Sequence, residues 1–289
     1  MLRSMTGFGR AEGRVGGRKV TVEIRSLNSK QLDLGVKLPG QWREKEADLR
    51  QWAAGRVVRG KAELTAAFDG VQGQKRTTFN ADLVQAYYNE LRAVAGTVAP
   101  DAATDLLGLV LRMPEVMTTA REELDPAEWP ATMALMDQAW KNFDAFRLAE
   151  GAKLKAELGE RTANITALLS QAGALDGGRI ERTRARILAR LEELQAKVDH
   201  DRFEQELVFY LEKLDITEEK LRLATHCGYF LETMAGEEGQ GRKLGFIAQE
   251  MGREINTLGS KSNDAAMQKL VVLMKDELEK IKEQVLNVL

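Results

Sequence analysis

The spacing of hydrophobic residues changes part-way along the chain, and this change limits the folds that it can adopt. Over the first 70 residues apolar and polar side chains alternate, as in Val20, Val22 and Ile24. That is the period of a strand with one buried face. The alternation predicts strands over 4–12, 19–26, 32–38 and 61–68. Between the third and fourth strands the spacing becomes helical from Trp42 to Val57, so the predicted order is βββαβ.

A further helix is expected directly after these strands. Residues 81–94 have helical spacing, and Asn80 precedes them as an N-cap. We therefore predict that residues 1–125 form an α+β domain with the order βββαβα.

From about residue 104 onward, the apolar residues recur three or four apart, which is typical of helices. A helical run starts near 131 and continues past 155, and a glycine-rich turn at 173–178 separates it from a second run over 179–198. This pattern predicts a long helical hairpin over 126–200 that serves oligomerisation. The remaining residues, 201–289, predict an all-α region with helices over 201–214, 217–234, 241–257 and 264–288.

The predicted hairpin carries more apolar residues than two helices can cover on each other. We expect other subunits to bury them, although the other two domains of the same chain could do so instead. The residues concerned are Met133, Met136, Trp140, Phe143, Phe146, Ile165, Leu168, Leu169, Ile187, Leu191 and Leu194.

Composition excludes several classes of protein. Cys227 is the single cysteine of the 289 residues, which rules out an internal disulfide and zinc sites with two or more thiolates. His200 and His226 are the two histidines, and the H-E-x-x-H motif of metalloproteases does not occur. A Walker phosphate loop and a G-x-S-x-G nucleophile elbow are also missing from the sequence. No stretch of 18 uninterrupted apolar residues or signal-peptide pattern occurs, so we expect a cytoplasmic protein.

Charge is unevenly distributed along the chain. Residues 1–61 hold 14 Lys and Arg against 6 Asp and Glu, although the whole chain has a net charge of -2. A basic surface of this kind attracts nucleic acid without reading its sequence. The alternative is a sheet face whose arginines are solvated or paired with carboxylates, and composition does not decide between the two.

Two helices near the C-terminal end place titratable residues on facing surfaces. Glu219, Arg222 and His226 share one face of the helix over 217–234, and Glu250, Arg253, Glu254 and Thr257 share one face of the next helix. The short turn between the helices makes them antiparallel. Counting outward from its centre, near residue 238, predicts that His226 is level with Glu250, and that Glu254 is level with about Arg222.

This arrangement predicts a metal site. Three carboxylates and one histidine suit a hard divalent cation such as Mg²⁺ or Mn²⁺, and Arg222 and Arg253 suit a phosphate. The alternative is a helix pair held together by Glu–Arg ion pairs, with His226 an interface histidine whose hydrogen bonds are satisfied. The loop over 257–264 contains Lys261 and precedes a new helix, so it suits either an anion or a simple pair of helix caps.

Several long segments carry a resemblance to a known family. They are RSMTGFGRAE at 3–12, EIRSLNSKQLD at 23–33, RGKAEL at 59–64, DITEEKLRLATHCGYFLETM at 215–234 and GRKLGFIAQEMGREINTLGSKSNDA at 241–265. In these segments the sequence resembles the YicC/YloC family of bacterial endoribonucleases. The resemblance implies metal-dependent cleavage of RNA by a homo-oligomer, a hexamer, that clamps the strand. The predicted opening also resembles the fold of ribonuclease PH and certain ribosomal proteins.

The resemblance also implies roles for individual residues. The family's acidic and histidine pattern falls on Glu219, His226, Glu250 and Glu254, the expected metal ligands, with Arg222 and Arg253 beside them in the catalytic site. The residues expected to contact RNA are Arg3, Arg10, Arg25, Asn28, Lys30 and Lys261. We therefore expect a cytoplasmic, metal-dependent endoribonuclease. The alternatives are a non-catalytic RNA-binding adaptor and a purely structural scaffold.

Overall fold

An α+β unit forms the N-terminal part of the computed structural model, which describes residues 2–69, 77–100, 105–119, 125–193, 200–236, 239–262 and 264–289. Its sheet has the order β1-β2-β4-β3, and the pairs are antiparallel except for β3 and β4. The strands are β1 (Gly7–Val15), β2 (Arg18–Leu27), β3 (Leu32–Lys37) and β4 (Gly60–Asp69), and a short 3-10 turn, η1 (Gly40–Lys45), leads into α1 (Glu46–Val57). The predicted α+β class and the order βββαβ are confirmed, whereas the likeness to ribonuclease PH stays a prediction.

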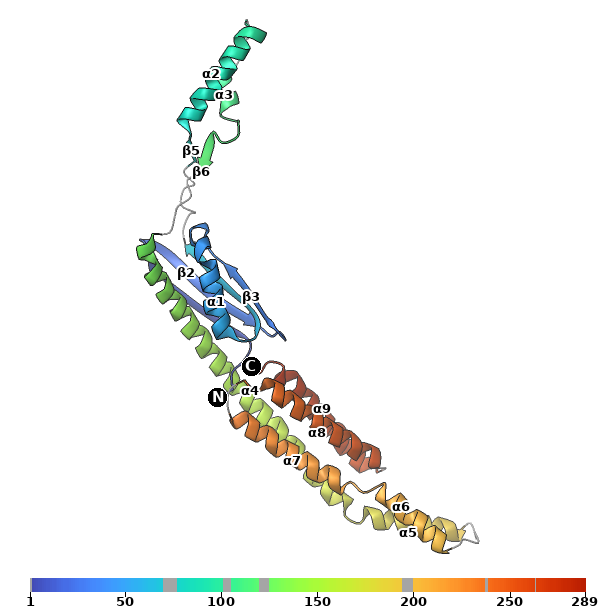
Figure 1. The fold of residues 1–289 in the computed structure, drawn as a ribbon. Helices are drawn as coiled ribbons and strands as arrows, with labels where there is room; N and C mark the ends of the chain where they lie inside the picture. Colours follow the sequence, from blue (N-terminus) through green and yellow to red (C-terminus); the bar gives the residue numbers. More distant parts are fainter. Residues whose placement is uncertain are drawn as a thin grey trace.

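The long helix α4 (Trp129–Asp176) covers one face of this sheet (Figure 1). Glycine makes the close approach to β1 possible, because a Cβ on Gly9 would overlap the backbone of α4 at Ala139 and Phe143. The covered face contributes Val20, Val22 and Ile24 from β2, and Phe143 from α4 joins them in one buried cluster. The opposite face of the sheet carries the charged residues of the strands.

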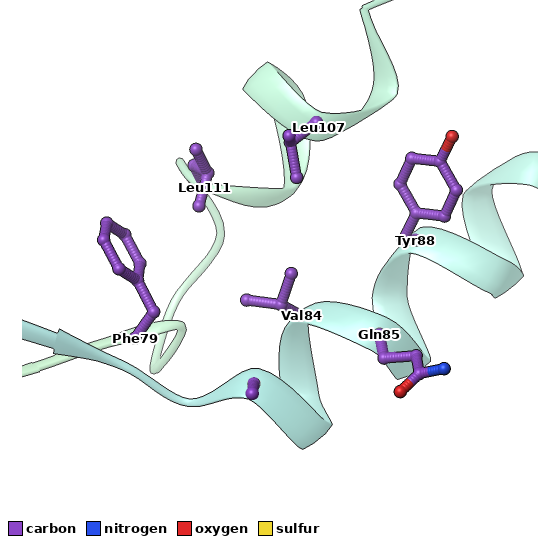
Figure 2. A pocket seen from close by; sticks show the side chains of 7 residues that line it. Phe79, Val84, Gln85, Tyr88, Leu107 and Leu111 are labelled. Carbon is purple, nitrogen blue, oxygen red and sulfur yellow. The ribbon is translucent and has the colours of Figure 1, made fainter.

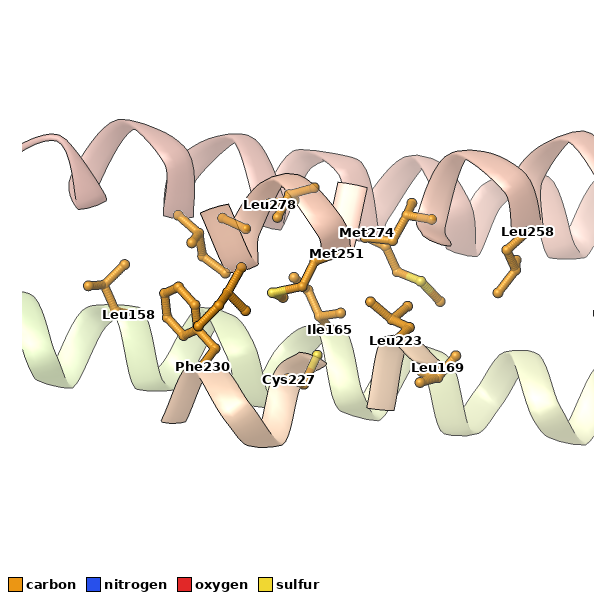
Figure 3. Close-up of a cluster of buried hydrophobic side chains, with 14 of the residues drawn as sticks. Leu158, Ile165, Leu169, Leu223, Cys227, Phe230, Met251, Leu258, Met274 and Leu278 are labelled. Atoms are coloured by element: carbon orange, nitrogen blue, oxygen red, sulfur yellow. The ribbon is translucent and has the colours of Figure 1, made fainter. Parts of the chain in front are cut away.

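The C-terminal half of α4 packs in a second core with α7 (Thr217–Ala235), α8 (Gly241–Lys261) and α9 (Ala265–Val285). Figure 3 shows that this core is filled by side chains from all four helices. On α8, three glycines seven residues apart, Gly245, Gly252 and Gly259, face side chains of α9. A Cβ on Gly259 would lie 2.9 Å from Val271 Cγ1, so the missing side chain lets the two helices approach.

The long hairpin expected over 126–200 is not what the structure shows. The 48 residues of α4 pack on β1, α7 and α9 instead of along α5 (Arg179–Glu193), which lies with α6 (His200–Glu212) at the end of α4 away from the sheet (Figure 1). Met136, Phe143 and Ile165 are therefore fully buried within the same chain. The expectation that other subunits bury Met136, Phe143 and Ile165 is wrong, because the sheet and the C-terminal helices of the same chain bury them. Leu194, another residue of that expectation, lies outside the described residues.

A small separate unit is formed by β5 (Thr77–Phe79), α2 (Ala81–Val98), α3 (Leu106–Val110) and β6 (Met117–Thr119). The predicted N-cap is confirmed, because the Asn80 side chain accepts a hydrogen bond from the Leu83 N–H. Strand β6 corrects the prediction that every segment after 104 is helical; it forms because it pairs with β5, a contact distant in sequence. Phe79, Val84, Tyr88 and Leu107 line a shallow apolar pocket in this unit (Figure 2).

The first and last described residues join the sheet to the helical core. Ser4 forms an isolated β-bridge with Val288, and the Leu289 N–H donates to the Arg3 carbonyl over 3.0 Å. The two ends of the chain therefore lie side by side (Figure 1). Across the described ranges, no helix is both long enough and apolar enough to cross a membrane.

Candidate active site on two antiparallel helices

Ion pairs between α7 and α8 show how these two helices align. Arg222 Nη1 lies 3.9 Å from Glu254 Oε1, and Lys261 Nζ lies 2.8 Å from Glu219 Oε1. The predicted level of Glu254 with Arg222 is thus confirmed. One turn further along each helix, four residues from this pair, His226 on α7 falls level with Glu250 on α8.

The four predicted metal ligands differ in their surroundings. Glu219 and Glu254 are buried, with side chains 8% and 11% exposed, and each is paired with a cation of the other helix. Glu250 is 41% exposed and accepts from Arg253 on its own helix, 2.7 Å away. His226 is half-buried, and the described residues give it no hydrogen bond or ion pair. Glu250 and His226 are therefore the predicted ligands that solvent can reach.

The arginines of the site face solvent. Arg222 and Arg253 have side chains 58% and 74% exposed, so each is free to exchange its carboxylate partner for a phosphate. Arg222 also contacts Glu218, 2.5 Å away, on its own helix. Both guanidinium groups lie beside the Glu250–Glu254 turn of α8, where an anionic substrate would meet them.

The part of the chain that the structure describes does not contain a preformed metal centre. Within the described residues, no group of three or more His, Cys, Asp and Glu side chains could hold a metal ion. Glu250 and Glu254 are one turn apart, and Mg²⁺ in proteins is often held by one or two carboxylates together with substrate phosphates and water. The carboxylates present fit an ion that arrives with the substrate better than a resident one.

Most of the predicted RNA contacts are occupied by carboxylates. Arg25 Nη2 lies 2.7 Å from Glu23 Oε2, Arg10 pairs with both Glu12 and Glu23, and Arg3 Nη2 lies 3.3 Å from Asp144 Oδ2. Lys261 is committed to Glu219. Composition left open whether the arginines of the sheet are paired with carboxylates, and Arg10 and Arg25 are paired in this way. However, Glu12 and Glu23 are themselves counted within residues 1–61, so their pairs leave the basic excess of that segment in place.

The remaining two predicted RNA contacts lie in the loop after β2. The Asn28 side chain donates to Asn287 Oδ1 over 3.5 Å, which places this loop beside the end of the chain. Lys30 is exposed, and no ion pair of it is found in the described part of the chain. Lys30 is thus the most accessible cation among the residues predicted to contact RNA.

A partly buried polar network beside the site was missed from the sequence. Asp176 accepts from Lys220 Nζ over 2.6 Å and from Arg179 Nε over 2.9 Å. Burial works to raise the pKa of Asp176, but the hydrogen bonds and charges of Lys220 and Arg179 outweigh it and hold the pKa below its usual value. Arg179 also donates to the carbonyls of Lys261 and Leu214. One buried guanidinium therefore ties down the loops before α7 and after α8.

Arg179 is the first of five arginines between residues 179 and 190. Nothing in their spacing distinguishes Arg179 from the exposed arginines that follow it. Its burial depends on where two distant loops meet. A single sequence contains no signal for that contact.

Cys227 takes no part in the surface of the site. It is buried in the second core, where burial raises the pKa of its thiol to about 11 and a hydrogen bond with Thr166 acts in the opposite direction. The thiol stays protonated near neutral pH and is not a nucleophile there. This agrees with its interpretation as a small core residue.

Comparison with models of known protein families shows to which family the chain belongs. Residues 2–156 match the family model described as "Endoribonuclease YicC-like, N-terminal region", and residues 174–289 match "Endoribonuclease YicC-like, C-terminal". The chain belongs to the YicC-like endoribonuclease family. Both regions of the YicC-like family are present, and one match ends and the other begins inside α4.

Two relatives align along nearly the whole YicC-like chain. The "Probable endoribonuclease YicC" of Clostridioides difficile (strain 630) is 31% identical over 295 residues, covering 100% of both chains. The protein of the same name from Haemophilus influenzae (strain ATCC 51907 / DSM 11121 / KW20 / Rd) is 30% identical over 289 residues, covering 99% of each. The YicC-like similarity therefore includes both the sheet and the helical site.

Proposed function

We propose that the protein is a cytoplasmic endoribonuclease that hydrolyses RNA phosphodiester bonds with the help of a divalent cation, Mg²⁺ or Mn²⁺. The observation that carries this proposal is membership of the YicC-like endoribonuclease family over both regions of the chain. The relatives' printed names favour an enzyme over a non-catalytic RNA-binding adaptor.

The geometry of α7 and α8 supports roles for individual residues. The exposed Arg222 and Arg253 hold the phosphate, because a guanidinium donates two parallel hydrogen bonds to phosphate oxygens. His226 lies level with Glu250, and an imidazole is the side chain that most often transfers protons in enzymes. We assign it the transfer of a proton to or from the scissile phosphodiester.

The carboxylates Glu250 and Glu254 are the proposed cation ligands, with the RNA phosphate completing the site. A bound divalent cation supplies polarisation of the phosphodiester and a lowered pKa of water. Glu219 is the predicted ligand least suited to this role, because Lys261 neutralises it in a buried setting. We assign Glu219 and Lys261 to holding α7 and α8 in register.

RNA is proposed to reach the site along the surface that includes Lys30 and Asn28. Arg3, Arg10 and Arg25 can contribute only by releasing their carboxylate partners, which exposed ion pairs do at little cost. Binding of this type is electrostatic and tolerant of sequence.

A homo-oligomer, a hexamer by family resemblance, is also proposed. The small unit that contains α2 and α3 supports this oligomer. Helix α2 has no buried residue, and the pocket between α2 and α3 is lined mainly by apolar side chains. A soluble monomer rarely leaves such a surface uncovered. Another copy of the chain is the proposed cover, and light scattering of the purified protein tests it.

Cleavage by the purified protein tests the proposed function. We expect a labelled RNA to be cut internally when Mg²⁺ or Mn²⁺ is present and to survive when EDTA replaces the metal. RNA that binds but stays intact under both conditions would indicate the adaptor instead.

A further inference from the structure

One stripe of α8 is fully solvent-facing and has an unusual composition. Its six residues recur four and three apart, so they point within about 40° of one direction on the helix. They are Arg242, Phe246, Gln249, Arg253, Asn256 and Ser260, and all six are exposed. We call this set the α8 stripe. The buried residues of α8 lie on the opposite side, where they pack on α7 and α9.

The chemistry of the α8 stripe matches single-stranded RNA. It holds two arginines and no carboxylate of its own, which suits a phosphate backbone. Phe246 is 67% exposed, whereas the other large apolar side chains of α8 are buried against α7 and α9. An exposed ring beside cations is the element on which an unpaired base stacks. Gln249 and Asn256 add amide groups that pair with base edges.

The α8 stripe lies next to the proposed catalytic groups. Glu250 and Glu254 sit about a quarter-turn around α8 from it, on the side that faces α7. That side is identified by the contacts of α7 with Glu254, with Lys261 and with Lys243, whose Nζ lies 4.7 Å from the Tyr229 ring centre. A strand lying along the stripe would bring its phosphates near these carboxylates, where a divalent cation would offset the repulsion between the two anionic groups.

We propose that the α8 stripe binds an unpaired segment of the RNA substrate, with Phe246 stacking on a base and Arg242 contacting a phosphate. This inference rests on the proposed function and makes the substrate single-stranded at the point of cleavage. Five of the six residues are polar or charged, which favours this occupant over an apolar contact with a second copy of the chain.

RNA binding measured in EDTA tests the α8 stripe without cleavage, because the divalent cation proposed for catalysis is absent. The probe is a short single-stranded RNA with one 2-aminopurine, whose fluorescence falls when it stacks on a ring. We expect Phe246→Leu to weaken binding about tenfold and to lose the quenching, since stacking contributes about 1–3 kcal/mol per base. Phe246→Tyr should restore both. Phe209→Leu is the matched control, because Phe209 on α6 is also exposed, at 55%.

Two further measurements complete the test. Arg242→Gln should lower the slope of log affinity against log salt by about 0.7, the value for one phosphate contact with a single strand. Arg186→Gln on α5 is its control and should leave the slope unchanged. A duplex of the same sequence should bind in a way that does not depend on Phe246, because its bases are already stacked.

Several outcomes would overturn the inference. Unchanged affinity and quenching in Phe246→Leu would do so, and the nuclease proposal would stand if the parent still cleaves RNA. A lower mass of Phe246→Leu in light scattering would instead make the stripe a contact between subunits. If the parent shows Phe246-dependent quenching but cuts no RNA with either metal, the stripe is upheld and the nuclease proposal fails.

Discussion

The Arg222 guanidinium on α7 lies 3.9 Å from the Glu254 carboxylate on α8, so these two residues lie at the same height of the helix pair. Glu250, one turn before Glu254 on α8, is then level with His226. The two helices bring a carboxylate, a histidine and two arginines to one surface without any loop.

Glu250 is the carboxylate whose removal should affect chemistry most cleanly. Because its side chain is 41% exposed and, among the described residues, pairs with the exposed Arg253 alone, Glu250→Gln should leave the melting temperature within about 1 °C of the parent. We expect cleavage to fall by about a hundredfold or more, because one of the two carboxylates proposed to hold the cation is lost. RNA affinity in EDTA should stay unchanged.

Glu279→Gln on α9 is the control for charge alone, since Glu279 is an exposed carboxylate paired with Lys282 on the same helix. Full activity in Glu250→Gln, with the parent's stability, would remove this residue from the catalytic set.

The affinity for RNA should fall steeply as salt rises. Among the predicted N-terminal contacts, Lys30 lacks an ion pair in the described ranges, whereas Arg25 is held by Glu23. Lys30→Gln should therefore reduce the salt slope by about 0.7, and Arg25→Gln should reduce it less. Fluorescence anisotropy at several salt concentrations measures both. A flat dependence in the parent would argue against electrostatic binding.

Asp176 should make stability depend on pH in the acid range. Its pKa in the folded protein is held below the unfolded value of about 3.9. The stabilisation is therefore complete above that value and is lost as pH falls through the lower, folded pKa. Asp176→Asn should lower the free energy of unfolding at pH 7 by about 1–3 kcal/mol, because Lys220 and the buried Arg179 lose their charged partner.

Urea unfolding at neutral pH and below about pH 3 checks this expectation, with the difference between parent and variant shrinking at the lower pH. Asp276→Asn on α9 is the control, since Asp276 pairs with Lys280 at the surface. A constant difference at both pH values would show that the charge of Asp176 is not what matters.

Two glycine substitutions should change stability in opposite directions. A Cβ on Gly159 of α4 meets nothing within 4 Å, so Gly159→Ala should stabilise the protein by up to about 1 kcal/mol through helix propensity. A Cβ on Gly259 would meet Val271 at 2.9 Å, so Gly259→Ala should destabilise it by about 1–3 kcal/mol. Thermal unfolding of both variants decides whether the glycines of α8 are needed for its packing on α9.

The Cys227 thiol should be unreactive in the folded protein. Burial and a pKa raised to about 11 leave almost no thiolate at pH 7.5. We expect iodoacetamide to label it only after denaturation, as measured by mass spectrometry. Rapid labelling of the native protein would show that α4 and α7 separate readily around this residue.

The sequence predicts those parts of the fold in which neighbours along the chain decide the structure. Alternation in β2 and the side-chain cap at Asn80 are local signals, and both are confirmed. The pairing of β6 with β5 and the partners of α4 are contacts between distant segments, and the prediction was wrong about them. Periodicity shows that α4 has an apolar face but does not show what covers it.

The same distinction holds for the site. The short turn after α7 predicts the level of Glu254 with Arg222, because counting residues along antiparallel helices is a local argument. It does not predict that Lys261 neutralises Glu219, or that Glu23 pairs with Arg25 across the exposed sheet face. Side-chain partners depend on rotamers and on burial, which spacing leaves open. The catalytic and RNA-binding roles stay predictions.

Helix α4 supplies Phe143 to the core beneath the sheet and Ile165 to the core among the helices, without a break between them. Loss of either core would leave half of this helix without packing, and isolated helices of this kind are marginal in water. The two family regions should consequently melt in a single cooperative transition, even though each has its own hydrophobic core. A fragment ending between residues 156 and 174 would take away part of this shared helix, and neither piece should refold with the stability of the intact chain.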